Sequence, residues 1–520
     1  MGKVLVRNPL IWADVPDVDV VRYKNAFYMI STSMHSMPGC PIMKSTDLAH
    51  WKLDHYVFET FDDGAGHTLE DGKGVYGNGS WAASLKVLGD TFYAVFNCND
   101  TRHFYVYKCE DIDSGKWEQI AKIDDFFHDP ALFFEADGTP YVIYGGGDIQ
   151  IVELEKDLSK VKEGGIHQFL LSTPRENIGL RCEGGHAYKI GEYYYLIYIE
   201  WPTDGHGRRR EICYRSKDLL GPYERKIILD DDMGYANQGV AQGCIFEDGF
   251  DHWYAMLFQD HFAVGRIPYL LPLTWKDDWP MPGVDGKVPK EFVVELPWIR
   301  EGEDIAGAEA EYALVISDEF DYTDNKLSLQ WQWNHNPDNG LWSVTARPGY
   351  LRLITGRLVE KGVQQARNTL TQRTEGPECE ACTKLDFANL KIGDSAGLVA
   401  MQGQFGCVGV RKTQEGSILC VTFNDGQYGE QVVWSKALDE QVTQLFLKIR
   451  YDFRLGQDKA YFFYSLDGEN YEQADAILQM RYTLDHFMGY RTGMYCYATK
   501  ETGGYADFDF FRYTGVQYWM

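Results

Sequence analysis

The sequence lacks any long hydrophobic run. No stretch approaches the roughly 18 apolar residues of a transmembrane helix, and the first residues, MGKVLVRNPLIW, contain no apolar core of the length found in signal peptides. A membrane is therefore not an expected partner. The chain as given predicts a cytoplasmic protein, or a secreted one if a leader precedes it.

Cysteine follows no framework spacing. The chain has 11 cysteines, an odd number that excludes complete intramolecular pairing. The only C-x-x-C motif, CEAC at 379–382, has neither a second pair nor a βαβ pattern around it, so no zinc or redox role is expected from it. The sequence leaves any metal site unknown.

Positive charge is scarce relative to negative charge. The 50 lysines and arginines face 77 aspartates and glutamates, which gives a formal net charge of −27. Such a surface repels the phosphate backbone of nucleic acids and anionic lipid headgroups, so neither is an expected partner. A soluble protein that binds a neutral or cationic ligand fits this balance.

Helical periodicity is nearly absent, and short aromatic or alternating runs take its place. Aromatic residues make up 15% of the chain, with 34 Tyr and 14 Trp, and Gly, Asp and Asn turns separate the runs. This pattern predicts an all-β chain, and aromatic side chains also suit sites that stack against sugars. A length of 520 residues predicts at least two domains.

A repeat organises the first 300 residues. Five segments share a turn, a bulky residue, a tyrosine and an apolar strand: YKNAFYMIST, LGDTFYAVFN, ADGTPYVIYG, IGEYYYLIYI and GFDHWYAMLF. The shared tyrosines are Tyr28, Tyr93, Tyr141, Tyr195 and Tyr254, with spacings of 65, 48, 54 and 59 residues. Each segment is followed by another strand. The pattern predicts a five-bladed β-propeller over residues 1–300.

A second domain follows a break in this repeat. Residues 279–314 are rich in proline and charge, which predicts a linker at 301–312. About eight short strands beyond it predict a β-sandwich of the jelly-roll type over 313–520. The aromatic cluster WQWNHN (331–336) is interpreted as core packing, with sugar binding as the alternative.

One ring of residues is expected around the propeller axis. Eleven or twelve residues before the shared tyrosines stand Asp17, the Trp81–Ala82 pair, Asp129, Glu183 and Gln242. The innermost strands of a propeller surround one axis, so their equivalent ends should form one pocket. The sequence therefore predicts that three acids distant in the chain lie close together.

Two carboxylates across a small pocket can hydrolyse a glycosidic bond. Glu183 has the longer side chain and is the predicted general acid. Asp17 follows Pro16, which stiffens the backbone, and is the predicted general base. A third carboxylate near the acid raises its pKa by repulsion between like charges, and Asp129 is the predicted pKa modulator.

The same residues carry a family resemblance. NPLIWADVPDVDVV, HDPALFFEADGTPYVIYG and RCEGGHAYKIGEYYYLIY resemble three segments of glycoside hydrolase family 43, the β-xylosidase and α-L-arabinofuranosidase group. The resemblance places Asp17 at the base position, Asp129 at the modulator position and Glu183 at the acid position. It implies a five-bladed propeller, and the C-terminal part resembles the β-sandwich of the family's β-xylosidases.

Further segments add substrate contacts. SWAASL and LFQDHFAVGRIPYLLPLTW also resemble the family, which implies that Trp81 and Arg266 bind substrate. Gln242, at the fifth position of the ring, and Met34 with His35, on the loop leaving the first blade's inner strand, are further candidates. His128 and His186 stand beside the acids, either as structural histidines or as hydrogen-bond partners of the pocket. The basic run GHGRRR (205–210) is interpreted as a solvated loop, with a role at the pocket rim as the alternative.

The chain departs from the family at two positions. Val18 stands where the family usually has a second proline. Ala241 stands where many members have a histidine near an axial calcium or water. A structural calcium therefore lacks its usual ligand here, although other oxygen ligands could hold one, and no cofactor is required for the chemistry.

The predicted function is an exo-acting, inverting glycoside hydrolase. It would release xylose, arabinose or both from non-reducing ends of xylo-oligosaccharides or arabinoxylan fragments, as a xylan 1,4-β-xylosidase or a bifunctional enzyme. The alternatives are a primary α-L-arabinofuranosidase, a non-catalytic sugar-binding propeller, and a five-bladed fructosidase or phosphorolytic enzyme. The fructosidase motif Asn-Asp-Pro-Asn-Gly is absent. Whether the chain forms a homo-oligomer is left open.

Overall fold

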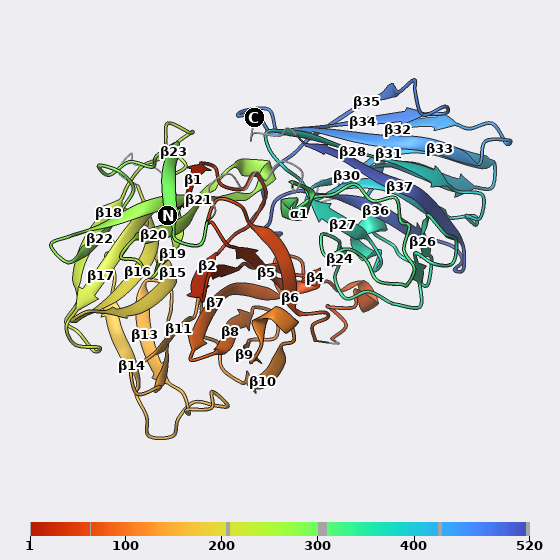
Figure 1. Cartoon of the computed structure of the whole chain (residues 1–520). Coiled ribbons are helices and arrows are strands. Elements are labelled where there is room, and N and C mark those ends of the chain that lie inside the picture. The colour runs from red at the N-terminus through yellow and green to blue at the C-terminus, as the bar shows by residue number, and fades with distance from the viewer. Residues whose placement is uncertain (1, 63, 204–207, 300–308, 425–428, 516–520) are drawn as a thin grey trace.

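The computed structural model describes residues 2–62, 64–203, 208–299, 309–424 and 429–515. Two bodies of β-sheet lie beside each other (Figure 1). The single α-helix in these ranges is α1 (Glu309–Tyr312). Four short 3-10 helices accompany the strands: η1 (Glu70–Gly72), η2 (Ile112–Ser114), η3 (Phe262–Val264) and η4 (Gly362–Gln365). None of the helices described here is long and apolar enough to cross a membrane.

The N-terminal body is a five-bladed propeller, as predicted. The first blade has strands β2 (Asp19–Tyr23), β3 (Ala26–Ile30), β5 (Gly39–Ser45) and β6 (Lys52–Phe58). The second has β7 (Ser80–Leu88), β8 (Thr91–Cys98), β9 (His103–Cys109) and β10 (Glu118–Ile123). The third has β11 (Ala131–Phe134), β12 (Pro140–Tyr144), β13 (Asp148–Glu153) and β14 (His167–Ser172).

The fourth and fifth blades complete the ring. The fourth has β15 (Ile178–Ile190), β16 (Tyr193–Pro202), β17 (Arg210–Ser216) and β18 (Glu224–Leu229). The fifth has β19 (Ala241–Glu247), β20 (Trp253–Asp260), β21 (Arg266–Lys276) and β22 (Trp279–Pro282). Each first strand contacts the first strand of the next blade, and β19 contacts β2. β1 (Gly2–Arg7) pairs with β23 (Glu291–Leu296) outside the blades.

The repeated tyrosines have equivalent positions, and two of them clearly pack between blades. All five lie on the second strand of a blade. Tyr28 packs edge-on against Phe92 of the second blade, with ring centroids 5.4 Å apart. Tyr195 packs in the same way against Trp275 of the fifth blade at 5.2 Å. A large aromatic residue at this position fills the gap between two sheets, which explains why the sequence repeats it.

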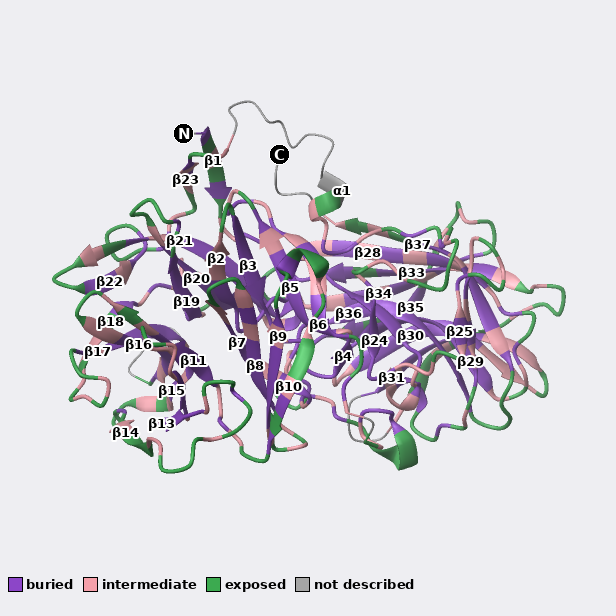
Figure 2. Ribbon diagram, turned by 60° about the horizontal axis from the view of Figure 1, so that its bottom comes forward, coloured by how far each residue is buried: buried purple, intermediate pink, exposed green. Residues whose placement is uncertain are grey.

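The C-terminal body is a two-sheet sandwich, as predicted. One sheet has seven strands in the order β25 (Trp342–Ser343), β26 (Leu351–Ile354), β37 (Tyr505–Gly515), β28 (Glu378–Asp386), β33 (Gln444–Asp452), β34 (Lys459–Ser465) and β35 (Glu472–Gln479). The other has eight, in the order β32 (Gln431–Ala437), β31 (Gly416–Asn424), β30 (Phe405–Thr413), β29 (Asp394–Met401), β36 (Arg491–Ala498), β27 (Leu370–Arg373), β24 (Gln332–Asn334) and β4 (Ser36–Met37). Figure 2 shows buried strands through the centre of both bodies.

The cluster WQWNHN belongs to this core. Trp331 packs against Phe511 with ring centroids 4.9 Å apart, and Trp333 packs against Trp342 at 5.0 Å. Both tryptophans on this segment are buried. The core-packing interpretation is therefore confirmed for them.

The two bodies are joined by more than the connecting chain. Strand β4 comes from the propeller but pairs with β24 at the edge of the sandwich sheet. The carboxylate of Asp14 accepts hydrogen bonds from the backbone N–H of Arg266 in the propeller and of Gly489 in the sandwich, at 2.7 and 2.9 Å. Of the predicted linker, residues 301–308 lie outside the described ranges, and the predicted domain boundaries stay a prediction.

Three buried histidines meet at this junction. His35 lies between His335 and His486, with ring centroids 4.9 Å from each, and Tyr76 packs against all three. Burial holds the pKa of His35 and of His335 well below the ordinary range. Burial also lowers the pKa of His486, to about 3.

These histidines should make the junction sensitive to acid. The unfolded chain takes up a proton on each below the ordinary pKa of 6.5, whereas folded His486 does so only near 3. The folded state therefore loses about 1.4 kcal/mol per histidine for each pH unit below that ordinary value. We expect the melting temperature to fall between pH 7.5 and 5 and to fall less in His486→Gln. An equal pH dependence in the variant would contradict this account.

Candidate functional site

The ring residues stand where the inner strands begin. Asp17 and Asp129 each lie two residues before an inner strand, and Trp81 and Gln242 are second residues of β7 and β19. Glu183 lies inside β15, between two register shifts. Asp17, Asp129 and Gln242 have positive φ values of 53°, 47° and 70°. Left-handed residues and bulges redirect side chains at strand ends and concentrate at functional sites.

The Glu-Gly-Gly stretch at 183–185 has a specific packing role. Gly184 has φ +65°, and a Cβ there would lie 2.8 Å from the side chain of Gln242 in the next blade. Its backbone N–H donates a 2.8 Å hydrogen bond to Asp129 Oδ2. Gly184 thus lets three inner strands approach one another closely. Its N–H also holds the carboxylate of Asp129 next to the backbone that follows Glu183.

Asp17 is buried against two donors. Arg266 Nη1 lies 3.0 Å from both of its carboxylate oxygens, and Gln242 Nε2 donates to Oδ1 at 2.7 Å. Asp17 is only 6% exposed. Burial raises the pKa of Asp17 to about 6 and outweighs the opposing charge of Arg266. Asp17 is therefore largely ionised at neutral pH and close to its titration range, as a general base requires.

Arg209, from the basic run GHGRRR, extends this network. Its Nη1 donates to Gln242 Oε1 at 2.6 Å and its Nε to Asp260 Oδ2 at 2.9 Å. Gln242 is therefore held with its Nε2 toward Asp17. Residues 205–207 of the GHGRRR run lie outside the described ranges, but Arg209 is only 4% exposed. The solvated-loop interpretation is wrong for this arginine.

Glu183 lies in a more open setting, beside His128. Its side chain is 25% exposed, against 6% for Asp17. His128 Nε2 is 3.5 Å from Glu183 Oε2 and 3.7 Å from Asp129 Oδ2. The charge of Asp129 raises the pKa of His128 to about 9. The sequence left open whether His128 is a structural histidine or a hydrogen-bond partner of the pocket. The structure shows that it is a partner of the pocket acids.

His186, in contrast, has a structural role. Its Nε2 lies 3.6 Å from Asp19 Oδ1, in a buried position, and burial lowers the pKa of its imidazole. Asp19 also accepts hydrogen bonds from Lys86 Nζ and from the backbone N–H of Leu85, at 2.7 and 2.9 Å. His186 is therefore a structural histidine that reaches from β15 of the fourth blade to Asp19 of the first.

The sandwich contributes an aromatic side chain to the site. Phe487 stacks on Trp81 with ring centroids 5.6 Å apart and planes 8° from parallel. Its ring centroid lies 4.9 Å from the Arg266 guanidinium, and its carbonyl accepts from Arg266 Nη2 at 3.1 Å. Trp81 in turn meets His128 edge-on at 6.1 Å. Trp81, Phe487, Arg266 and Asp17 thus form one connected wall.

Two substrate-binding candidates sit deeper. Met34 is 1% exposed and forms a β-bridge with Ser80, next to Trp81. The side-chain contacts described for His35 are those of the junction histidines and Tyr76, not of the three acids. Substrate contact by either residue stays a prediction.

The fifth blade does not offer the family's calcium ligand. Ala241 is fully buried and has no side-chain donor atom. Both ends of the neighbouring Gln242 side chain are engaged, by Asp17 and by Arg209. The residues at this position therefore do not fit an axial calcium held in the family's manner.

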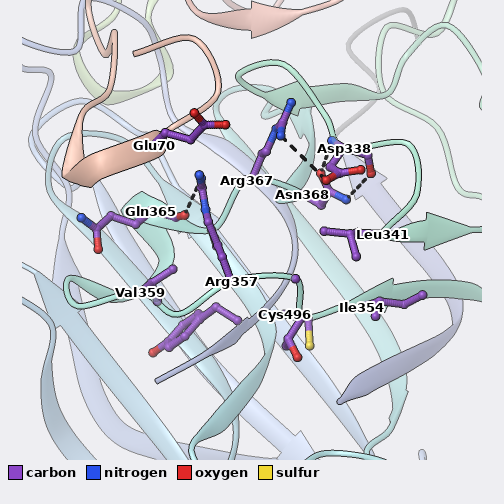
Figure 3. Close-up of a pocket in the computed structure, with 14 residues that line it drawn as sticks. Glu70, Asp338, Leu341, Ile354, Arg357, Val359, Gln365, Arg367, Asn368 and Cys496 are labelled. Atoms are coloured by element: carbon purple, nitrogen blue, oxygen red, sulfur yellow. Dashed lines mark hydrogen bonds and ion pairs between the residues drawn. The ribbon is translucent and has the colours of Figure 1, made fainter. Parts of the chain in front are cut away.

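A cavity at the edge of the sandwich lies apart from the ring of acids. It measures about 200 Å³ and lies between the 3-10 segment of Glu70 and the sandwich, where Arg357, Arg367 and Tyr497 line it (Figure 3). Neither Asp17, Asp129 nor Glu183 borders it. The candidate site is defined by the ring of acids.

Comparisons with known proteins match both bodies of the chain. The profile "Glycosyl hydrolases family 43" matches residues 6–280, and "Beta xylosidase C-terminal Concanavalin A-like domain" matches 317–514. A beta-xylosidase of Formosa agariphila is 28% identical over 97% of this chain and 90% of its own length. A non-reducing end alpha-L-arabinofuranosidase of Bacteroides ovatus is 26% identical over 77% of this chain and 74% of its own.

A solved structure is more similar still. The "Bifunctional GH43-CE" of Bacteroides eggerthii is 40% identical, with a TM-score of 0.89 over 99% of this chain. The present chain spans 64% of the length of that protein. These likenesses cover both the propeller and the sandwich.

Proposed function

The chain belongs to family 43 of the glycosyl hydrolases, and from this premise we propose that it is an exo-acting enzyme that releases xylose, arabinose or both from non-reducing ends of xylo-oligosaccharides and arabinoxylan fragments. The observation that carries the proposal is the pair of carboxylates in unlike settings. Asp17 is buried between Arg266 and Gln242, whereas Glu183 is partly exposed beside His128.

Each carboxylate then has its own task. Asp17, ionised and fixed by two donors, accepts a proton from the attacking water. Glu183 donates a proton to the leaving oxygen on the opposite face of the sugar. Attack and departure on opposite faces invert the anomeric centre, which is the general outcome in family 43.

Asp129 supports the acid rather than touching the leaving group. It accepts from the N–H of Gly184 and pairs with His128, which also contacts Glu183. Its position therefore fixes both the backbone after the acid and the cation beside it. The negative charge of Asp129 favours protonation of its neighbours, the effect expected of a pKa modulator.

The wall of Trp81 and Phe487 supports the exo-acting assignment. Phe487 reaches the propeller from the sandwich and stacks on Trp81 beside Arg266. Aromatic faces bind the apolar faces of sugars, and a wall from a second domain narrows the opening of a pocket. A long polysaccharide would therefore enter end first.

Two aryl glycosides test the proposal. We expect turnover of 4-nitrophenyl β-D-xylopyranoside, of 4-nitrophenyl α-L-arabinofuranoside, or of both, with the first-formed sugar of inverted configuration in a time-resolved proton NMR spectrum. Preference for the arabinofuranoside would place the chain with the arabinofuranosidases of the family. No turnover of any glycoside would leave only the sugar-binding alternative, and acceleration by added phosphate would indicate phosphorolysis.

Loss of Arg266 should change the pH profile as well as the rate. Arg266→Ala removes the cation that lowers the pKa of Asp17, so the acidic limb of kcat/KM should move to higher pH. It also leaves a buried carboxylate without its ionic partner, which costs about 3–5 kcal/mol, so the melting temperature must be measured alongside. Arg266→Lys keeps the charge and should shift the limb less. If the acidic limb stays in place in both variants, Arg266 does not control the pKa of the general base.

A further inference from the structure

Three metal-binding side chains meet beside the second blade, and none of them belongs to the ring of acids. His67 precedes strand β7, Cys98 is the last residue of β8, and Asp100 lies in the turn that follows. His67 Nε2 is 2.9 Å from Asp100 Oδ2, and Cys98 Sγ is 2.9 Å from Asp100 Oδ1. One ligand atom from each residue lies within 4.8 Å of the other two.

The cluster is enclosed but has one open side. His67 is 2% exposed and Cys98 is fully buried. The Asp100 side chain is 24% exposed, so an ion and a water ligand can reach the cluster from solvent on that side. The protein would supply three ligands and solvent the fourth.

The donor set selects the kind of metal. Calcium and magnesium take oxygen ligands, whereas an imidazole, a thiolate and a carboxylate together suit zinc. Zinc bonds of about 2.0–2.3 Å in a tetrahedron place neighbouring ligand atoms about 3.3–3.7 Å apart. The two 2.9 Å contacts would have to open by less than about 1 Å, which side-chain rotation supplies.

We propose that His67, Cys98 and Asp100 bind a zinc ion that clamps the segment before β7 to the end of β8. Without the ion, Cys98 Sγ–H donates a hydrogen bond to Asp100. Zinc binding replaces that proton with a metal–sulfur bond and releases the proton to solvent, with no change of oxidation state. His67 binds through Nε2 as a neutral imidazole whose ring proton is on Nδ1, and Asp100 binds through a carboxylate oxygen.

The position of the clamp gives it a structural consequence. Asp100 Oδ1 also accepts from the N–H of Gly79, the residue immediately before the strand that carries Trp81. The carbonyl of His67 accepts from the N–H of Asn336 in the sandwich at 2.9 Å. An ion here would therefore stabilise both the approach to Trp81 and the junction between the two bodies.

Cobalt is the probe, because its spectrum reports thiolate ligation directly. The full-length protein, stripped of metal and kept reduced, is titrated with Co²⁺. We expect a thiolate-to-cobalt charge-transfer band with the strong visible absorption of a tetrahedral site, and loss of both on adding Zn²⁺. The melting temperature should rise by a few degrees with excess Zn²⁺, because the ion binds the folded state preferentially.

Matched variants identify the sulfur. Cys98→Ser keeps a hydroxyl that can donate to Asp100, so it should fold, and it should lose the charge-transfer band and the Zn²⁺-dependent rise in melting temperature. Cys382→Ser is the control, because Cys382 alone among the 11 cysteines is partly exposed, and all 11 lie in the described residues. It should retain both signals.

Asp100→Asn tests the carboxylate separately. An asparagine oxygen can still accept from Gly79 N–H, and the loss of a charged ligand should weaken Co²⁺ binding about tenfold or more. The proposal is overturned if wild type shows no charge-transfer band, or if the band persists in Cys98→Ser or disappears in Cys382→Ser. The second group of metal-binding atoms, at His128, Asp129 and Glu183, has no thiolate and cannot produce this band. The test does not depend on glycosidase activity.

Discussion

Glu183→Gln should slow the hydrolysis of xylobiose by about 10²–10⁴-fold and affect 4-nitrophenyl xyloside much less. A general acid matters in proportion to how poor the leaving group is. The alkoxide of a xylose unit is a strong base and needs a proton as the bond breaks, whereas nitrophenolate leaves readily without one. Gln keeps nearly the shape of Glu but has no acidic proton to give.

The measurement is kcat/KM for the two substrates at several pH values. In the wild type the basic limb should report the acid, and in Glu183→Gln that limb should flatten for the nitrophenyl substrate. His128→Asn is a useful companion variant. It removes the imidazole whose Nε2 lies 3.5 Å from Glu183 Oε2 and leaves the Glu183 carboxylate in place. Equal losses on xylobiose and nitrophenyl xyloside in Glu183→Gln would contradict the acid assignment.

The propeller was predictable because its signal is repeated five times. A tyrosine recurs on each second strand, and Tyr28 and Tyr195 show how it fills the space between blades. The ring followed from the fold, because equivalent strand ends surround one axis. Gly184 shows how closely local sequence and site are linked, since no side chain fits between it and Gln242.

The rest of the site depends on contacts that no local pattern encodes. Phe487 stands 406 positions after Trp81 in the sequence, yet the two rings stack. Arg209 lies in a run of three arginines, a composition typical of solvent-exposed loops. Only the fold reveals that Asp260 and Gln242 accept hydrogen bonds from its guanidinium. Strand β4 was not expected to leave its blade and complete a sheet of the sandwich.

The surroundings of the two carboxylates bear on their roles. Asp17 is more deeply buried, but Arg266 and Gln242 favour its ionised form and fix both oxygens. A fixed, ionised carboxylate suits a base that must orient one water. Glu183 is more open to solvent and has His128 alone as a described side-chain partner within 4.0 Å, which leaves its carboxyl free to meet the leaving oxygen.

Asp17→Asn should abolish most activity on both substrates alike, again by about 10²–10⁴-fold. The attacking water needs its base whatever group departs, so the ratio of kcat/KM for xylobiose to that for nitrophenyl xyloside should stay at the wild-type value. In Glu183→Gln the same ratio should fall. This ratio separates base from acid even if both variants are nearly inactive.

A folding defect must be distinguished from a chemical one. Asparagine removes the charge that balances Arg266 in a buried position, and its amide NH₂ would face donors at Arg266 Nη1 or Gln242 Nε2. We therefore expect a lower melting temperature in Asp17→Asn, and kcat/KM must be measured well below it. Glu183→Gln, at a more exposed position, should melt close to the wild type and serves as the stability control. If Asp17→Asn is well folded and its ratio falls as in Glu183→Gln, Asp17 is not the base, because a base cannot act on one leaving group and spare another.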